Sequence, residues 1–360
     1  MNNKFRAGVK YAAQFLGWLF LLFLATEIFT RLVMVSAPTF ESKINGGGVE
    51  IYGIEGYGVI YYLPNMEIAT PYSGGENIVT LGDSYTQARQ LFFWNNYSSV
   101  AEKELRSEGY AMDVRNFGYM ASAFPYYLGI GKSLIKTYHP SLVVIQLSPK
   151  DFTGSRAFDK TVSFYFAVKS GDLVLKNRLA KDNRWIKSPS KIRDDIGFSF
   201  YSRLSIETLL YIRNGQDVVA PDEGAPLPSG TKGNKGESAV SNKPGDKVKM
   251  SSEDIYAQSL SLLESIYGDI PIVFILKPDF AKKDLLFSYK QDTQTLVSLI
   301  ERRPFWSVIY LDEAFNRSFN SGISPIGFGN TDPFSGHWNN RGHEIVGKLL
   351  AERIAEILGK

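Results

Sequence analysis

Five short segments predicted as strands alternate with segments of helical periodicity between residues 77 and 358, and this alternation restricts the fold more than any other feature. The predicted strands are residues 77–81, 112–117, 142–147, 270–276 and 307–311, and all but the second are predominantly apolar. The predicted helices are residues 95–108, 125–138, 252–267, 285–302 and 342–358. Strands that alternate with helices in this way form a parallel sheet with helices on both of its faces. The sequence therefore predicts an α/β fold.

The N-terminus has the features of a membrane anchor. Three basic residues among the first ten precede an apolar run over residues 11–26, and Glu27 and Arg31 follow it. A spanning helix needs roughly 20 residues, which the chain provides if the Glu27–Arg31 pair lies at the interface. A cleaved signal peptide is the alternative, but its apolar region is typically about 7–15 residues long. We expect residues 1–36 to form a cytoplasmic flank and one transmembrane helix that exports the remainder.

The exported part divides into three regions. Residues 37–76 are rich in glycine and tyrosine without clear periodicity and are predicted to be a lead-in that wraps the domain. Residues 77–360 carry the strand and helix alternation, which an insertion at residues 152–250 interrupts. Within that insertion, residues 164–175 are typical of a β-hairpin, and residues 202–213 of a helix. Residues 217–248 are rich in Pro, Gly, Ser and Lys and lack aromatic side chains, so we expect disorder there.

The composition excludes several classes of function. The chain has no cysteine, which rules out disulfides, thiolate metal sites and a cysteine nucleophile. With only His139, His337 and His343, a multi-histidine metal site is not expected, and no cofactor is predicted. Basic and acidic residues nearly balance at a net charge of +3, which argues against a nucleic-acid partner.

Candidate catalytic residues follow the predicted strands or precede the last helix. Ser84 lies after the first strand, where it either caps a helix or acts as an exposed nucleophile. His337 could take its proton, and Asp332 could orient that histidine. The backbone N–H groups of Ser84 and Gly118 could stabilise an oxyanion. In parallel sheets such residues meet at the edge formed by the carboxyl ends of the strands.

The order of these motifs resembles the sequence blocks of SGNH/GDSL hydrolases. The resemblance rests on GDSYT at 82–86, NFG at 116–118, a strand followed by Asp151, and DPFSGHWNNRGH at 332–343. It implies a flavodoxin-like three-layer α/β/α sandwich with Ser84 as nucleophile, His337 as base and Gly118 as an oxyanion donor. Three further segments resemble those of membrane-anchored members of this family: the exit from the anchor at Glu27 and Arg31, the hairpin insertion at 164–175 and the SRLS segment at 202–205.

Two positions depart from that family's pattern. The family usually places its acid three residues before the histidine, where this chain has Phe334, while Asp332 lies five residues before. Either Asp332 completes a triad through a bulge, or a Ser–His dyad operates. The family's oxyanion asparagine is replaced by Lys150, a flexible point charge that either points into the site or into solvent. The adjacent Asp151 either lines the site or braces its loop.

Together these features predict an extracytoplasmic serine esterase that forms an acyl-serine intermediate. By the resemblance, its substrates are O-acyl groups on glycans or lipids, and its location is the periplasmic side of the inner membrane. One alternative is an O-acyltransferase in envelope polysaccharide modification, which would need a membrane partner as acyl donor. Another is a non-catalytic SGNH-like binding or scaffold protein.

Overall fold

The computed structural model describes the α/β unit almost completely and the N-terminal region in part. The described residues are 11, 14–22, 24–25, 48–52, 55–56, 58–62, 67–68, 70, 74–153, 162–179, 218–219, 250–329, 331 and 334–359. Residues 202–213, where a helix was predicted, lie outside this part of the chain.

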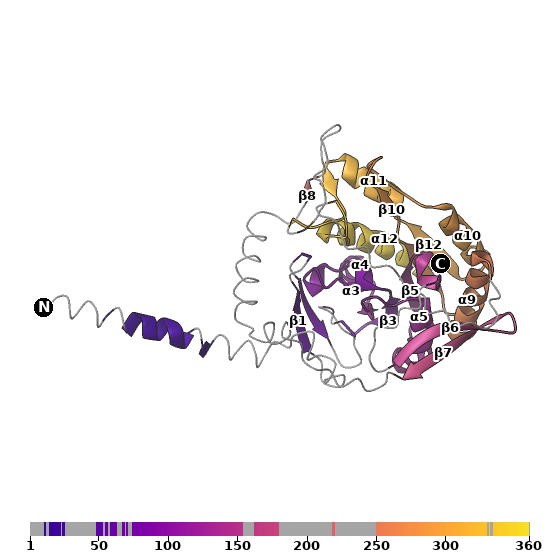
Figure 1. Ribbon diagram of the computed structural model, residues 1–360, viewed down its shortest axis with the longest axis horizontal. Coiled ribbons are helices and arrows are strands. Elements are labelled where there is room, and N and C mark those ends of the chain that lie inside the picture. Colours follow the sequence, from indigo (N-terminus) through magenta and orange to yellow (C-terminus); the bar gives the residue numbers. More distant parts are fainter. Residues whose placement is uncertain are drawn as a thin grey trace, which may run out of the picture.

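A five-stranded parallel sheet lies at the centre of the molecule (Figure 1). Its strands are β3 (Glu76–Leu81), β4 (Met112–Asn116), β5 (Leu142–Leu147), β9 (Ile272–Leu276) and β12 (Trp306–Tyr310). They lie in the order β12-β9-β5-β3-β4, and every neighbouring pair is parallel. Numbered along the chain, this order is 2-1-3-4-5, the flavodoxin-like arrangement. The predicted parallel α/β fold is confirmed.

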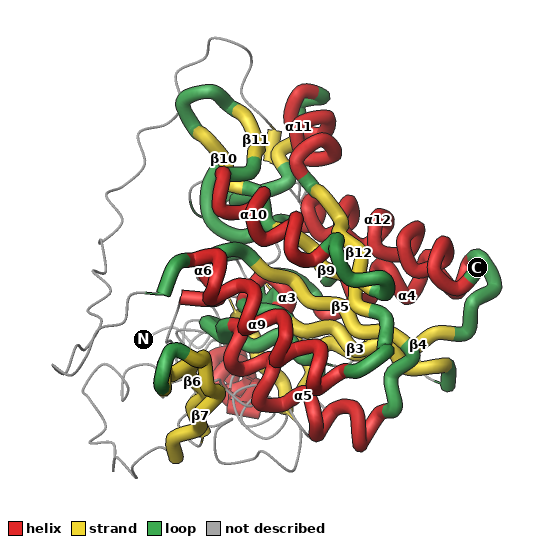
Figure 2. The backbone as a smooth tube through the Cα atoms, turned by 90° about the vertical axis from the view of Figure 1, so that its right-hand side faces the viewer, coloured by secondary structure: helices red, strands yellow, loops and turns green. Residues whose placement is uncertain are grey.

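Helices cover both faces of the sheet (Figure 2). On one face lie α4 (Tyr97–Ser107), α11 (Asp312–Asn320) and α12 (Asn340–Leu358). On the other lie α5 (Phe124–Tyr138), α9 (Ser252–Tyr267) and α10 (Gln291–Ile300). Successive strand residues point to opposite faces, so Ile78 packs in the first layer and Val79 in the second. Two cores thus hold the strand ends in fixed positions.

Four short antiparallel pairs surround the sheet. They are β1 (Gly48–Tyr52) with β2 (Gly58–Tyr62), β6 (Val162–Lys169) with β7 (Asp172–Leu179), β10 (Asp279–Ala281) with β11 (Leu286–Ser288), and β8 (Val218–Val219) with β13 (Ile323–Ser324). The β6–β7 pair confirms the predicted hairpin, whose turn residues Ser170 and Gly171 both have positive φ.

Two expectations concern these peripheral segments. Within residues 217–248, where disorder was predicted, Val218–Val219 pair with β13, while the other residues lie outside the described part, so disorder there stays a prediction. The predicted helix over residues 285–302 begins only at Gln291, because β11 occupies its first turn.

Helical residues 14–22 and 24–25 lie in the predicted anchor, and their side chains are exposed, Trp18 and Phe20 among them. Among the described residues, no helix combines the length and apolar character needed to cross a membrane.

Candidate active site

Ser84 lies where the central strand β3 gives way to a one-turn helix, α3 (Ser84–Gln87). The Asp83 carboxylate caps this turn by accepting the Tyr85 N–H at 2.9 Å. A Cβ on Gly82 would overlap the Thr86 hydroxyl, so glycine is needed for the chain to turn this tightly. The turn fixes the Ser84 hydroxyl at the carboxyl edge of the sheet, as predicted.

His337 meets Ser84 from the loop that precedes α12. Its Nε2 lies 2.7 Å from Ser84 Oγ, although 253 positions separate the two residues. The Tyr85 ring packs against the imidazole at 4.7 Å between centroids, and its hydroxyl donates to the Gly336 carbonyl at 3.0 Å. The structure thus brings the predicted nucleophile and base together, with the helical turn tied to the histidine loop.

Glu55 provides the carboxylate that contacts His337. Its Oε2 lies 2.5 Å from His337 Nδ1, and its Oε1 accepts the backbone N–H of His337 at 2.8 Å. Burial alone would raise the pKa of Glu55, but the hydrogen bonds and charge of His337 outweigh it, and the pKa is lowered. An ionised Glu55 accepts a hydrogen bond from Nδ1–H, which leaves Nε2 without a hydrogen and able to accept the Ser84 hydroxyl proton.

Close backbone packing holds Glu55 in place. It lies between β1 and β2, next to Gly56 and close to Gly58, where a Cβ would overlap the backbone of residues 89–91. Gly336, at φ +91°, approaches Glu55 so closely that a Cβ there would overlap Oε1. The lead-in hairpin therefore contributes a residue to the site as well as covering the domain.

The sequence indicates Asp332 as the acid, with a Ser–His dyad as the alternative, whereas the carboxylate that contacts His337 in the structure is Glu55. Asp332 itself lies outside the described residues. Phe334, at the spacing where the acid was expected, is buried in the core beside α12. No periodicity or spacing in the glycine-rich lead-in marks Glu55, so sequence reasoning missed it.

Gly118 does not have the arrangement expected of an oxyanion donor. Its N–H already donates to the Asn116 side-chain oxygen at 2.8 Å, and a Cβ on it would overlap the Gln87 backbone nitrogen. The loop after β4 thus braces α3. In the described part of the chain, the backbone N–H of Ser84 donates no hydrogen bond, so it is the open donor beside the nucleophile.

Lys150 and Asp151 are the first two residues of α6 (Lys150–Thr153), and their side chains have different surroundings. Asp151 Oδ2 accepts the backbone N–H of Ser148 at 2.6 Å and lies 3.2 Å from its hydroxyl, so it braces the loop after β5. Burial, reinforced by the nearby Asp83 charge, raises the pKa of Asp151. Lys150 is exposed and lines a pocket next to Tyr85.

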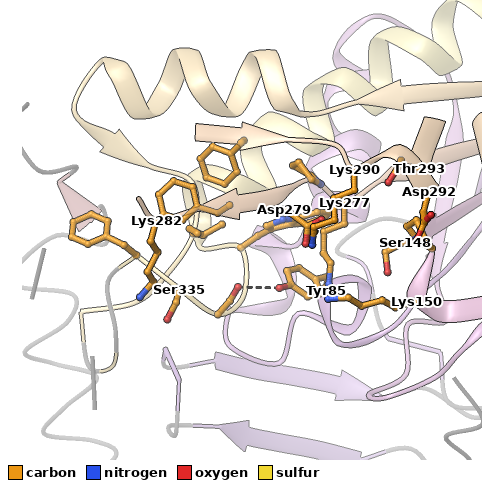
Figure 3. Close-up of a pocket in the computed structure, with 18 residues that line it drawn as sticks. Tyr85, Ser148, Lys150, Lys277, Asp279, Lys282, Lys290, Asp292, Thr293 and Ser335 are labelled. Carbon is orange, nitrogen blue, oxygen red and sulfur yellow. Dashed lines mark hydrogen bonds and ion pairs between the residues drawn. The ribbon is translucent and has the colours of Figure 1, made fainter. Parts of the chain in front are cut away.

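The structure adds Lys277, which the sequence did not indicate. It follows β9, and its Nζ lies 4.2 Å from the centroid of the Tyr85 ring. Burial would lower the pKa of Lys277, but the neighbouring Tyr85 and Asp83, with further carboxylates, raise it, so the ammonium stays charged. Figure 3 shows this lysine beside Tyr85 in a pocket of about 340 Å³.

The two remaining histidines are structural, as interpreted from the sequence. His343 is buried in α12, where its Nδ1 accepts the Tyr97 N–H at 3.1 Å, and burial lowers its pKa to about 3. His139 caps the end of α5. The described residues contain no group of three side chains arranged to hold a metal ion.

Comparison with known proteins gives weak matches. No protein-family profile matches the chain, and no curated protein is detectably similar. Among solved structures, TesA is 27% identical over 22% of this chain and 43% of its own, at a TM-score of 0.21. A family 3 carbohydrate esterase from Clostridium thermocellum is 10% identical over 80% of this chain and 100% of its own, at 0.37. The salicylyl-acyltransferase SsfX3, from a tetracycline biosynthetic pathway, is 11% identical over 81% and 58%, at 0.36.

TM-scores this low do not establish a shared fold. The fold of this chain is assigned from its own sheet order.

Proposed function

We propose that this chain, a member of the SGNH hydrolase superfamily by its motifs and sheet order, is a serine enzyme that cleaves acyl esters. The observation that carries this proposal is the continuous chain of contacts from Ser84 Oγ through the His337 imidazole to Glu55. A nucleophile bound to a base that is oriented by a carboxylate is the arrangement used for acyl transfer.

In the first half of the reaction, Ser84 Oγ attacks the ester carbonyl carbon while its proton passes to His337 Nε2. Glu55 stabilises the imidazolium that forms and holds its ring in place. The Ser84 N–H, which donates no hydrogen bond to the described part of the chain, stabilises the oxyanion in this mechanism. When the carbonyl re-forms, the bond to the alcohol oxygen breaks and the imidazolium protonates that oxygen. An acyl group then remains on Ser84.

In the second half, a hydroxyl group of the acceptor attacks the acyl-serine, and the same steps run in the opposite direction. His337 takes the proton of the acceptor, whose oxygen attacks the acyl carbon, and the released Ser84 oxygen recovers a proton from the imidazolium. Water as acceptor completes hydrolysis, which is the activity we favour. A sugar hydroxyl as acceptor would make the same site an O-acyltransferase, with O-acylated glycans or lipids as the substrate class in both cases.

The same proposal places the enzyme at a membrane, with residues 1–36 as its anchor and the α/β unit on the extracytoplasmic side. The apolar run after three basic residues supports this topology. Apart from Gln14, the described helical residues there are apolar, and they are exposed, Phe15, Trp18 and Phe20 among them. A helix that is apolar on all sides needs a lipid or protein environment.

A fluorophosphonate probe tests the catalytic assignment, because it reacts with activated serines. We expect a single adduct on Ser84, loss of labelling in Ser84→Ala, and strong reduction in His337→Ala. A non-catalytic binding protein would give no adduct on Ser84 in the wild-type chain.

A further inference from the structure

Tyr85 follows the nucleophile in the sequence, and its side chain contacts three consecutive residues of the loop that carries the base. Its ring lies 4.7 Å from the His337 imidazole and 5.0 Å from the Trp338 ring, measured between centroids. Its hydroxyl donates to the Gly336 carbonyl at 3.0 Å, a bond dashed in Figure 3. A movement of this ring would therefore move the histidine loop relative to the nucleophile turn.

The Tyr85 ring also contacts a positive charge. The Lys277 Nζ lies 4.2 Å from the ring centroid, within the roughly 6 Å at which an ammonium is attracted to an aromatic face. Lys277 directly follows β9, and its backbone N–H donates to the Leu147 carbonyl at 3.1 Å. The central sheet thus fixes the backbone from which the ammonium reaches the ring.

The charge of Lys277 is balanced within the protein. Burial acts to lower the pKa of Lys277, but Tyr85 and three carboxylates raise it. The carboxylates are those of Asp83, Asp151 and Asp279. Burial and the charge of Asp83 together raise the pKa of Asp151, so these two carboxylates repel each other. Without the ammonium, Asp83 at the cap of the nucleophile turn would lose the cation that offsets this repulsion.

The position of the imidazole is important in both halves of the reaction, because each passes a proton through His337 Nε2. Hydrogen bonds hold Nδ1 at Glu55 and Nε2 at Ser84. These two contacts leave the ring free to tilt about the line that joins its nitrogens, and the Tyr85 ring restricts that tilt. Misplacing a catalytic group by about 1 Å can cost on the order of 10²-fold in rate.

We propose that Lys277 and Tyr85 are positioning residues for the catalytic base: the ammonium fixes the tyrosine ring, and the ring holds the His337 imidazole against Ser84. This inference rests on the proposed function of Ser84 and His337 and assigns roles to two further residues. Lys277 contributes its charge, whereas Tyr85 contributes its ring and its hydroxyl. Neither side chain exchanges a proton with the substrate.

Steady-state kinetics of the full-length protein with p-nitrophenyl acetate separate positioning from substrate binding. Lys277→Met removes the charge and keeps a long side chain, whereas Tyr85→Phe removes the hydroxyl and keeps the ring. We expect kcat to fall about 10–100-fold in Lys277→Met and about 3–10-fold in Tyr85→Phe, with KM changed less than about twofold. Lys277→Arg restores a cation beside the ring and should keep at least about a third of the wild-type kcat.

Two matched variants serve as controls. Lys283→Met removes an exposed lysine charge from the segment that follows Lys277. Tyr310→Phe removes a tyrosine hydroxyl that donates to Glu301 at 3.0 Å, away from the catalytic residues. Both should keep kcat within about twofold of the wild-type value. Thermal denaturation of every variant shows whether a loss of kcat comes from a loss of folded protein.

Proton NMR provides a measurement that does not depend on turnover. The His337 Nδ1–H, which donates to Glu55, should give a far-downfield signal that is identified by its loss in His337→Ala. We expect faster exchange with water to broaden this signal in Lys277→Met and in Tyr85→Phe. The signal should be unchanged in the two control variants.

A wild-type kcat or an unchanged Nδ1–H signal in Lys277→Met would overturn the proposal. Equal losses of kcat in Lys277→Met and Lys277→Arg would also overturn it, because they would trace the effect to packing instead of charge.

These outcomes are distinct from failure of the proposed function. Inactive Ser84→Ala and His337→Ala proteins, together with wild-type kcat in Lys277→Met and Tyr85→Phe, refute the positioning roles alone. Turnover that is unaffected by Ser84→Ala refutes the catalytic proposal, and the Nδ1–H signal then still tests whether Lys277 and Tyr85 hold the imidazole.

Discussion

Replacing Glu55 by glutamine should remove most of the activity while leaving the fold intact. Glutamine has nearly the same shape and can still accept the His337 backbone N–H through its oxygen. Its NH₂ group then faces His337 Nδ1, where Oε2 of the glutamate accepted the Nδ1–H hydrogen bond. That contact favours the tautomer with hydrogen on Nε2, which cannot take the proton of Ser84.

The expected loss follows from this change of tautomer. Removing the charge of the orienting acid in comparable triads costs on the order of 10³–10⁴ in kcat, or about 4–5.5 kcal/mol of transition-state stabilisation. The assay is hydrolysis of p-nitrophenyl acetate by the full-length protein, with thermal denaturation as the check on folding. Asp332→Asn is the matched control, because it removes the other candidate acid, and we expect it to retain most of the activity.

Two results would refute this account of the acid. If Glu55→Gln kept more than about a tenth of the wild-type kcat, the site would operate as a Ser–His dyad. If Asp332→Asn lost as much activity as Glu55→Gln, the acid would come from the loop before His337.

Three further predictions concern Gly336, His343 and the N-terminal region. Gly336→Ala should lower kcat by at least about tenfold and the free energy of unfolding by about 1–3 kcal/mol, because its Cβ would overlap Glu55 and residue 336 has a positive φ. A kcat equal to that of the wild type would contradict the packing of Gly336 against Glu55. Burial lowers the pKa of His343 from 6.5 to about 3. Between these two pH values the unfolded chain therefore binds a proton at His343 that the folded chain does not bind. The free energy of unfolding should therefore fall as the pH decreases below 6.5, by up to about 1.4 kcal/mol per pH unit from this histidine. Denaturant melts at several pH values should show a weaker pH dependence in His343→Gln and an unchanged one in His139→Asn. A C-terminal alkaline phosphatase fusion should be active if residues 1–36 export the domain, whereas release of a shortened soluble form would show cleavage instead of anchoring.

The sheet and the Ser84–His337 pair could be predicted because local patterns determine them. The strands β5 and β9 are almost wholly apolar and buried on both faces, and all five predicted strands end within two residues of those in the structure. The carboxyl ends of parallel strands share one edge, which favours contact between Ser84 and His337, and the resemblance of the motifs to SGNH/GDSL blocks indicated the pair itself.

The rest of the site depends on contacts between distant segments. Glu55 reaches His337 across 282 positions, and its own segment shows no periodicity because its glycines serve close backbone packing. Asn116 accepts the Gly118 N–H, a local bond that the motif NFG does not distinguish from an open donor. Lys277 follows a strand in an ordinary Leu-Lys-Pro sequence, and its significance comes only from the Tyr85 ring that it contacts.

The acyl-serine intermediate is the most direct test of the central claim. The full-length protein is mixed with p-nitrophenyl acetate, quenched in acid within the first turnover, digested, and analysed by mass spectrometry. The contacts of Ser84 and His337 predict an acetyl group on the peptide containing Ser84, together with a burst of p-nitrophenol in wild-type protein and neither in Ser84→Ala. Turnover of the ester that is unaffected by Ser84→Ala, or an acetyl group on another residue, would contradict the assignment of Ser84 as nucleophile.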